Sequence, residues 1–142
     1  MKRLLIIFSF LIFFSCGEDE RPDLDGVIEQ FTVVLTSGDW KIDFFFDDDD
    51  DKTGEYEGYV FRYSVNGQVE AFLDGQSVDT GTWSTRTQDG AILFIINFPD
   101  GTPLGELSDD WFLAGFGDDI IDLQEENDLD SVDEDRIVFV LI

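Results

Sequence analysis

The chain has no histidine, and its only cysteine is Cys16. Histidine is the usual general base near neutral pH and the usual ligand of transition metals. A lone cysteine can form neither an internal disulfide nor a thiolate zinc site. These absences argue against histidine-based catalysis and against a transition-metal centre, so we expect no cofactor and no catalytic residues.

Basic residues are also scarce. The 142 residues include 8 Lys or Arg and 33 Asp or Glu, for a net charge of −25. Loss of Lys2 and Arg3 with a cleaved leader would leave 6 basic residues against 33 acidic ones, a net charge of −27. A surface this acidic repels phosphate backbones. The composition therefore predicts a protein that does not bind nucleic acid.

The N-terminal residues have the pattern of a secretory signal. Lys2 and Arg3 precede a largely apolar stretch, residues 4–14, and Ser15, Cys16 and Gly17 follow it. As a helix this stretch would span about 16 Å, too short for a bilayer core of about 30 Å. The pattern resembles a bacterial lipoprotein signal, which implies that residues 1–15 are removed and that the thiol of Cys16 is acylated. We therefore expect a membrane partner, reached through a lipid anchor on Cys16.

Residues 16–26 are acidic and contain few apolar side chains, so we expect a flexible tether. One interpretation of Glu18, Asp19 and Glu20 is a solvated linker on a periplasm-facing anchor. The other is that they resemble the acidic export signal of surface lipoproteins in the Bacteroidetes. The second interpretation predicts a lipid-anchored outer-membrane protein exposed at the cell surface.

Residues 27–142 have the pattern of short strands joined by turns. Apolar and polar residues alternate over 59–65, as in a half-buried strand, and Asn66-Gly67 is a strong hairpin signal. Further strands are expected at 40–46, 69–73, 81–85, 91–98, 111–116, 120–123 and 137–142.

The segment 24–37 is ambiguous. Its β-branched residues favour a strand, but Leu24, Ile28, Phe31 and Leu35 have helical spacing, and Asp23 or Asp25 could cap a helix. We favour a short helix. One helix and about eight short strands indicate an all-β protein, either an up-and-down antiparallel barrel of eight strands or a strongly curved sandwich. A closed barrel would protect the apolar last strand from an exposed edge.

The order of several motifs resembles the lipocalin-like lipoproteins of Flavobacteria and other Bacteroidetes. These motifs are Leu35-x-x-Gly38-x-Trp40, Gly58-Tyr59-Val60-Phe61, Gly81-Thr82-Trp83-Ser84 and Leu107-Ser108-Asp109-Asp110-Trp111. The resemblance covers about residues 27–142 and implies a calycin-type, lipocalin-like barrel with a short N-terminal helix. In lipocalins the Gly-x-Trp tryptophan packs against an arginine near the last strand. The resemblance thus implies that Gly38, Trp40 and Arg136 close the bottom of the barrel.

Two acidic runs are candidate cation sites. In the run 47–51, counting from Asp49 makes residues 49, 51, 53 and 54 resemble the start of a calcium loop, but the twelfth position is Val60 instead of glutamate. Counting from Asp47 puts Lys52 at the position of the turn glycine and Gly58 at the twelfth. We therefore expect a solvated hairpin loop that associates only weakly with divalent cations, and no specific metal site. The same expectation holds for the acidic residues between Glu125 and Asp135.

No catalytic constellation can be assembled from the sequence. Glycoside hydrolysis needs two carboxylates at a set separation, but with 33 acidic residues a fitting pair is uninformative. We expect a non-enzymatic binding protein. The many aromatic residues, with Tyr59, Phe61, Tyr63 and Trp83 expected on one face, leave two alternatives. The barrel carries a small hydrophobic ligand, or it is a filled structural or adhesive module whose acidic loops meet cations, glycans or a protein.

Overall fold

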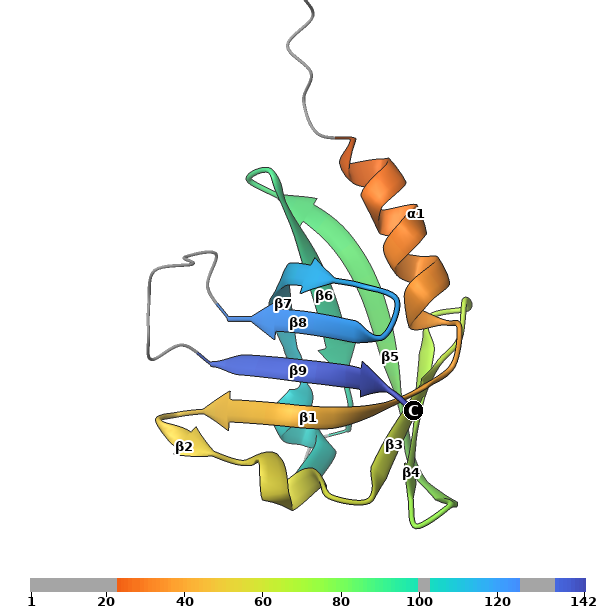
Figure 1. Ribbon diagram of the computed structural model, residues 1–142, viewed down its shortest axis with the longest axis vertical. Coiled ribbons are helices and arrows are strands. Elements are labelled where there is room, and N and C mark those ends of the chain that lie inside the picture. The colour runs from red at the N-terminus through yellow and green to blue at the C-terminus, as the bar shows by residue number, and fades with distance from the viewer. Residues whose placement is uncertain (1–22, 100–102, 126–134) are drawn as a thin grey trace, which may run out of the picture.

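The computed structural model of the chain describes residues 23–99, 103–125 and 135–142 (Figure 1). The predicted signal peptide, Cys16, the acidic triplet Glu18, Asp19 and Glu20, and most of the predicted tether lie outside these residues. The described part is one helix followed by a closed antiparallel β-barrel of eight strands. The predicted fold class is therefore confirmed, as a lipocalin-like barrel with a short N-terminal helix.

The ambiguous segment is a helix, α1 (Leu24–Leu35). Asp23 caps it, because its Oδ1 accepts a hydrogen bond from the Gly26 amide at 3.2 Å. Phe31 and Leu35 are fully buried. Helical spacing prevails over β-branched content because it gathers these two side chains on one face that can pack against the barrel.

The strands follow the chain in meander order. They are β1 (Asp39–Asp47), β2 (Asp50–Asp51), β3 (Tyr59–Tyr63), β4 (Gln68–Leu73), β5 (Gln76–Gln88), β6 (Ala91–Asn97), β7 (Asp109–Phe116), β8 (Ile120–Gln124) and β9 (Arg136–Leu141). Two 3₁₀ helices lie between strands, η1 (Thr53–Tyr56) and η2 (Pro103–Leu107). From β3 to β9 each strand pairs with the next one in the chain, and β1 pairs with β3 and β9. The short strand β2 pairs only with β1, as a hairpin. Pairing of β1 with β9 closes the barrel and leaves the apolar β9 without a free edge.

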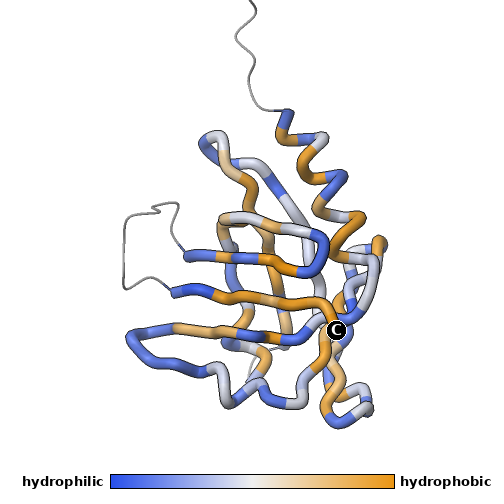
Figure 2. The backbone as a smooth tube through the Cα atoms, viewed as in Figure 1, coloured by the Kyte–Doolittle hydropathy of each residue, from blue (hydrophilic) through white to orange (hydrophobic). Residues whose placement is uncertain are grey.

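The hairpins form where the sequence predicts turns. Asp74-Gly75 and Asp89-Gly90 have positive φ at both residues, the two-residue turn that matches strand twist. Gly67 has φ +85°, and its amide donates to the Ser64 carbonyl at 3.0 Å, so this hairpin has a longer loop with glycine in the left-handed position. Figure 2 shows the β1–β2 turn as a strongly hydrophilic tip and β9 as a mainly hydrophobic strand.

A bulge at Asp43 decides which aromatics of β1 face inward. Ile42 pairs with Phe139 and Phe44 pairs with Val138, so one residue of β1 has no partner on β9. Beyond it the alternation shifts, and Phe45 is fully buried. Phe44 and Phe46 lie on the outer face, where their rings stack at 6.5 Å.

Candidate functional site

The interior of the barrel is filled with aromatic and aliphatic side chains. Among the described residues, no polar or charged residue is fully buried. The largest buried side chains are Trp40, Trp111, Tyr56, Phe31, Phe45, Phe61, Phe94, Phe98 and Phe139. Their rings meet mostly edge to face, as in the 5.5 Å contact between Phe61 and Phe139. A small barrel can be filled by its own side chains in this way.

The three tryptophans fasten neighbouring segments to the barrel. The indole Nε1–H of Trp40 donates to the Leu35 carbonyl at 2.8 Å, at the end of α1. Trp83 donates to Ser64 in the β3–β4 loop at 2.9 Å. Trp111 donates to Leu107 in η2 at 3.0 Å. Each buried indole N–H is thus satisfied by a backbone carbonyl, which fixes a segment that packs on the core.

Side chains from outside the strands complete the core. From α1, the ring of Phe31 meets Phe94 at 5.3 Å and Phe116 at 5.4 Å. From η1, the ring of Tyr56 meets Phe45 at 5.3 Å, and its hydroxyl donates to the Pro103 carbonyl at 2.8 Å. Burial and the nearby Glu106 carboxylate raise the pKa of Tyr56. The hydroxyl therefore stays protonated as a structural donor.

Trp40 and Arg136 do not meet, so the expected indole–guanidinium contact is wrong. Trp40 pairs with Leu141 at one end of β9, whereas Arg136 pairs with Phe46 at the other. On the outside of the barrel, the Arg136 guanidinium donates to both carboxylate oxygens of Asp122, at 2.9 and 2.7 Å. The physical reason is register, because five residues of strand separate the two ends of β9 by about 17 Å.

Gly38 and Trp40 do lie together at the end of the barrel, where α1 joins β1. A Cβ atom on Gly38 would stand 3.0 Å from Leu141 Cδ1, so a larger residue would press on the last strand. Gly38 thus allows close approach of the α1–β1 connection to β9. The end of the barrel is closed by α1, Gly38 and Trp40, and Arg136 takes no part in it.

The acidic run is a hairpin, with Asp48 and Asp49 at its turn in left-handed backbone. Carboxylate oxygens of Asp47, Asp48 and Asp135 lie within 4.8 Å of one another. The Lys52 ammonium is 2.6 Å from Asp47 Oδ2, and the Asp48 amide donates to Asp135 at 2.9 Å. Desolvation raises the pKa of Asp135. Lys52 already neutralises part of the negative charge of this cluster, so any divalent cation should bind there only weakly. This weak association stays a prediction.

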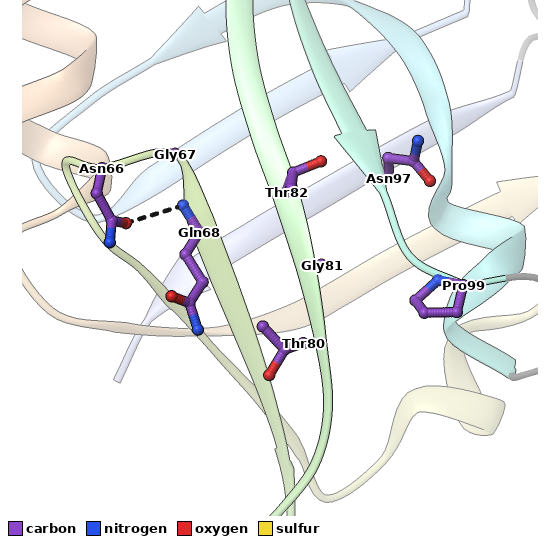
Figure 3. Close-up of a pocket in the computed structure, with 8 residues that line it drawn as sticks. All are labelled: Asn66, Gly67, Gln68, Thr80, Gly81, Thr82, Asn97 and Pro99. Carbon is purple, nitrogen blue, oxygen red and sulfur yellow. Dashed lines mark hydrogen bonds between the residues drawn. The ribbon is translucent and has the colours of Figure 1, made fainter.

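A polar hollow of about 600 Å³ lies on the outer face of β4, β5 and β6 (Figure 3). Gln68 pairs with Thr82, and Thr82 pairs with Asn97, which places three neutral side chains in one row across the strands. Pro99 forms one edge, and Asn66 accepts a hydrogen bond from the Gln68 amide at 3.1 Å. These amide and hydroxyl groups could bind a neutral polar ligand, in contrast to the acidic remainder of the surface.

A second cavity, of about 350 Å³, lies beside the seam between β1 and β3. Only two residue pairs, Asp39 with Arg62 and Trp40 with Phe61, join these strands. Beyond them β1 and β3 diverge and η1 fills part of the gap, with Ile42, Tyr56 and Tyr59 among the lining residues. Sequence reasoning missed this cavity, because the divergence depends on how the barrel closes and leaves no local signal.

The Tyr63 hydroxyl was also missed. It is buried and has no hydrogen-bond partner among the described residues. The ring lies among Trp83, Phe94 and Phe139. Burial raises the pKa of this phenol. The alternation of 59–65 predicted the inward ring correctly, but it carries no information on whether the hydroxyl finds a partner.

The fold and these surfaces define a class of protein, a closed, filled, lipocalin-like barrel whose charged side chains, among the described residues, lie on its outside. No model of a known protein family matches the chain, and no curated protein matches it either. Within the described residues there is no helix of sufficient length and hydrophobicity to cross a membrane.

Proposed function

We propose that this chain is a non-enzymatic, membrane-anchored lipoprotein of the outer membrane, acting as an interaction module at the cell surface. The observation that supports binding through the outer surface is the filled interior of the barrel. A carrier needs a cavity that buries most of its ligand, whereas here rings such as Phe61, Phe94 and Phe139 occupy the centre. Recognition is therefore assigned to the outside of the barrel.

The anchor is proposed from the N-terminal sequence. Six residues, 17–22, lie between the lipidation site Cys16 and Asp23, so seven Cα–Cα steps join the two. Fully extended they reach about 25 Å. An acylated Cys16 would therefore hold α1 close to the membrane.

Membrane fractionation with Cys16→Ser tests the anchor. We expect wild type in the membrane fraction and the variant in the soluble fraction, because the acyl chains supply the membrane affinity. Ser15→Ala is the matched control and should stay with the membrane. Retention of Cys16→Ser in the membrane would contradict acylation.

The module role is tested by native mass spectrometry of the protein purified in a detergent that preserves bound lipids. We expect, apart from the covalent anchor, the mass of the chain alone. A stoichiometric co-purified lipid that survives in Cys16→Ser would contradict a function carried only by the outer surface.

A second candidate is binding of a small hydrophobic ligand, favoured by the cavity at the β1–β3 seam. Its volume of about 350 Å³ is at the lower end of the range for ligand pockets. Ile42 and Tyr59 supply apolar walls. Val60→Trp should narrow the cavity and weaken such binding, whereas Val65→Trp, at an exposed position in the β3–β4 loop outside the cavity lining, should not. Equal binding by both variants would remove this candidate.

A further inference from the structure

A groove of about 620 Å³ separates α1 from the turn between β7 and β8. Helix residues form one wall and the turn forms the other, and Figure 1 shows α1 beside this side of the barrel. The lining residues are Glu29, Gln30, Val33, Val34, Phe116, Gly117 and Asp118. The groove combines apolar and acidic groups, unlike the neutral polar hollow of Figure 3.

The apolar part of the groove is continuous with the core. Val34 and Phe116 are partly buried and pack against the core, and the Phe116 ring is 5.4 Å from that of Phe31. Val33 is 70% exposed, one of the few large apolar side chains so open to solvent. The floor is thus held by packed side chains, while its edge offers apolar surface that nothing in the described chain covers.

Within residues 23–99, 103–125 and 135–142, the carboxylates that line the groove form no ion pair with a basic residue. The described ion pairs join Lys52 with Asp47 and Glu106, Arg62 with Asp39, Arg86 with Asp110, and Arg136 with Asp122. None of these pairs includes Glu29 or Asp118, although both line the groove. Asp119 adds a third exposed carboxylate beside them. Carboxylates bordering an apolar floor favour a partner that is both cationic and apolar.

We infer that this groove binds a cationic amphipathic segment of a partner protein. Its apolar face would lie on Val33, Val34 and Phe116, and its Lys or Arg side chains would pair with Glu29 and Asp118. A second copy of this chain fits poorly, because its net charge of −25 would repel the first. An anionic lipid surface would be repelled in the same way.

This inference deepens the proposed function, because it names the surface and the partner chemistry of the interaction module. It does not depend on the anchor, since peptide binding and membrane fractionation are separate measurements. The anchor can fail while the groove binds, and the groove can fail while the protein stays on the membrane.

The test uses the full chain in neutral phosphatidylcholine vesicles and a fluorescent 14-residue peptide of Lys and Leu with helical amphipathic spacing. Empty vesicles give the blank, and fluorescence anisotropy measures binding. We expect saturable one-to-one binding that weakens as salt rises, because the carboxylates are exposed. A scrambled peptide of the same composition should bind about 10-fold more weakly, since it lacks a continuous apolar face.

Matched variants separate the groove from general attraction to an acidic protein. Val33→Ser should weaken binding of the amphipathic peptide about 10-fold, whereas Val65→Ser, at a position 80% exposed in the β3–β4 loop, should leave it unchanged. The double variant Glu29→Gln, Asp118→Asn should lower the salt dependence more than Glu57→Gln, Asp89→Asn. Absence of saturable binding, equal binding of both peptides, or equal effects of groove and control variants would overturn the inference.

Discussion

The inside and the outside of this barrel are built from different chemistry. Inside, aromatic rings pack edge to face and the tryptophan N–H groups are satisfied by backbone carbonyls. Outside, carboxylates outnumber basic groups, and some of them, such as Glu29 and Asp118, have no ion-pair partner in the described chain. Burial of apolar area is the main source of folding free energy, whereas exposed ion pairs contribute little. Stability therefore comes mainly from the inside of the barrel, and the outside is the surface for which we propose recognition.

The largest expected effect is loss of an inner ring. Phe139→Ala removes a side chain that contacts Phe61 and Tyr63 in the centre, so we expect the free energy of unfolding to fall by about 3–5 kcal/mol. Chemical denaturation measures it. Phe44→Ala, on the outer face of β1, is the control and should cost clearly less. Equal losses would break the distinction between the two faces.

Trp40→Phe should have the next largest effect. It keeps an aromatic ring but leaves the buried Leu35 carbonyl without its donor, which costs about 1–3 kcal/mol. Arg136→Ala should cost under about 1 kcal/mol, because it removes only a largely exposed ion pair with Asp122. A double-mutant cycle between positions 40 and 136 should give additive effects within about 0.5 kcal/mol. Strong coupling would indicate that the two side chains are in contact, contrary to the strand register.

Tyr63→Phe should leave stability unchanged or raise it by about 1 kcal/mol. The variant removes a buried hydroxyl without a partner and keeps the ring. Thermal and denaturant unfolding measure the change, with Tyr56→Phe as the contrast, because the Tyr56 hydroxyl does have a partner. A loss of stability in Tyr63→Phe would reveal a hydrogen bond that the phenol makes in solution.

The smallest expected effect is at Asp135, on the acidic outside. Desolvation raises its pKa in the folded state, so the charged carboxylate disfavours folding at neutral pH. Asp135→Asn should therefore stabilise the protein slightly at pH 7. The gain should shrink as the pH falls through the raised pKa toward the unfolded value of about 3.9, where the wild-type group is protonated in both states. A gain that grows on acidification would contradict this sign.

The sequence predicts local and periodic features of the fold well. The spacing of Leu24, Ile28, Phe31 and Leu35 predicts α1, and the turn signals predict the hairpins. Features that depend on how the barrel closes leave no signal in the local sequence. Whether Phe44 or Phe45 faces inward depends on the bulge at Asp43, and the cavity beside η1 depends on the divergence of β1 and β3.

The candidate site was harder to predict than the fold. The resemblance predicts that Arg136 packs against Trp40, but strand register puts Arg136 beside Asp122. The groove at α1 gives no sequence signal, because Val33 resembles any other apolar residue of an amphipathic helix. Its exposure beside Phe116 emerges only once α1 packs against the β7–β8 turn.

Xenon binding tests the filled interior most directly, because xenon enters dry apolar cavities that remain empty in a folded protein. A crystal pressurised with xenon would report on the space between Phe61, Phe94 and Phe139. We predict no xenon density there. Well-occupied density among these three rings would contradict a packed core and would return ligand binding to the inside of the barrel.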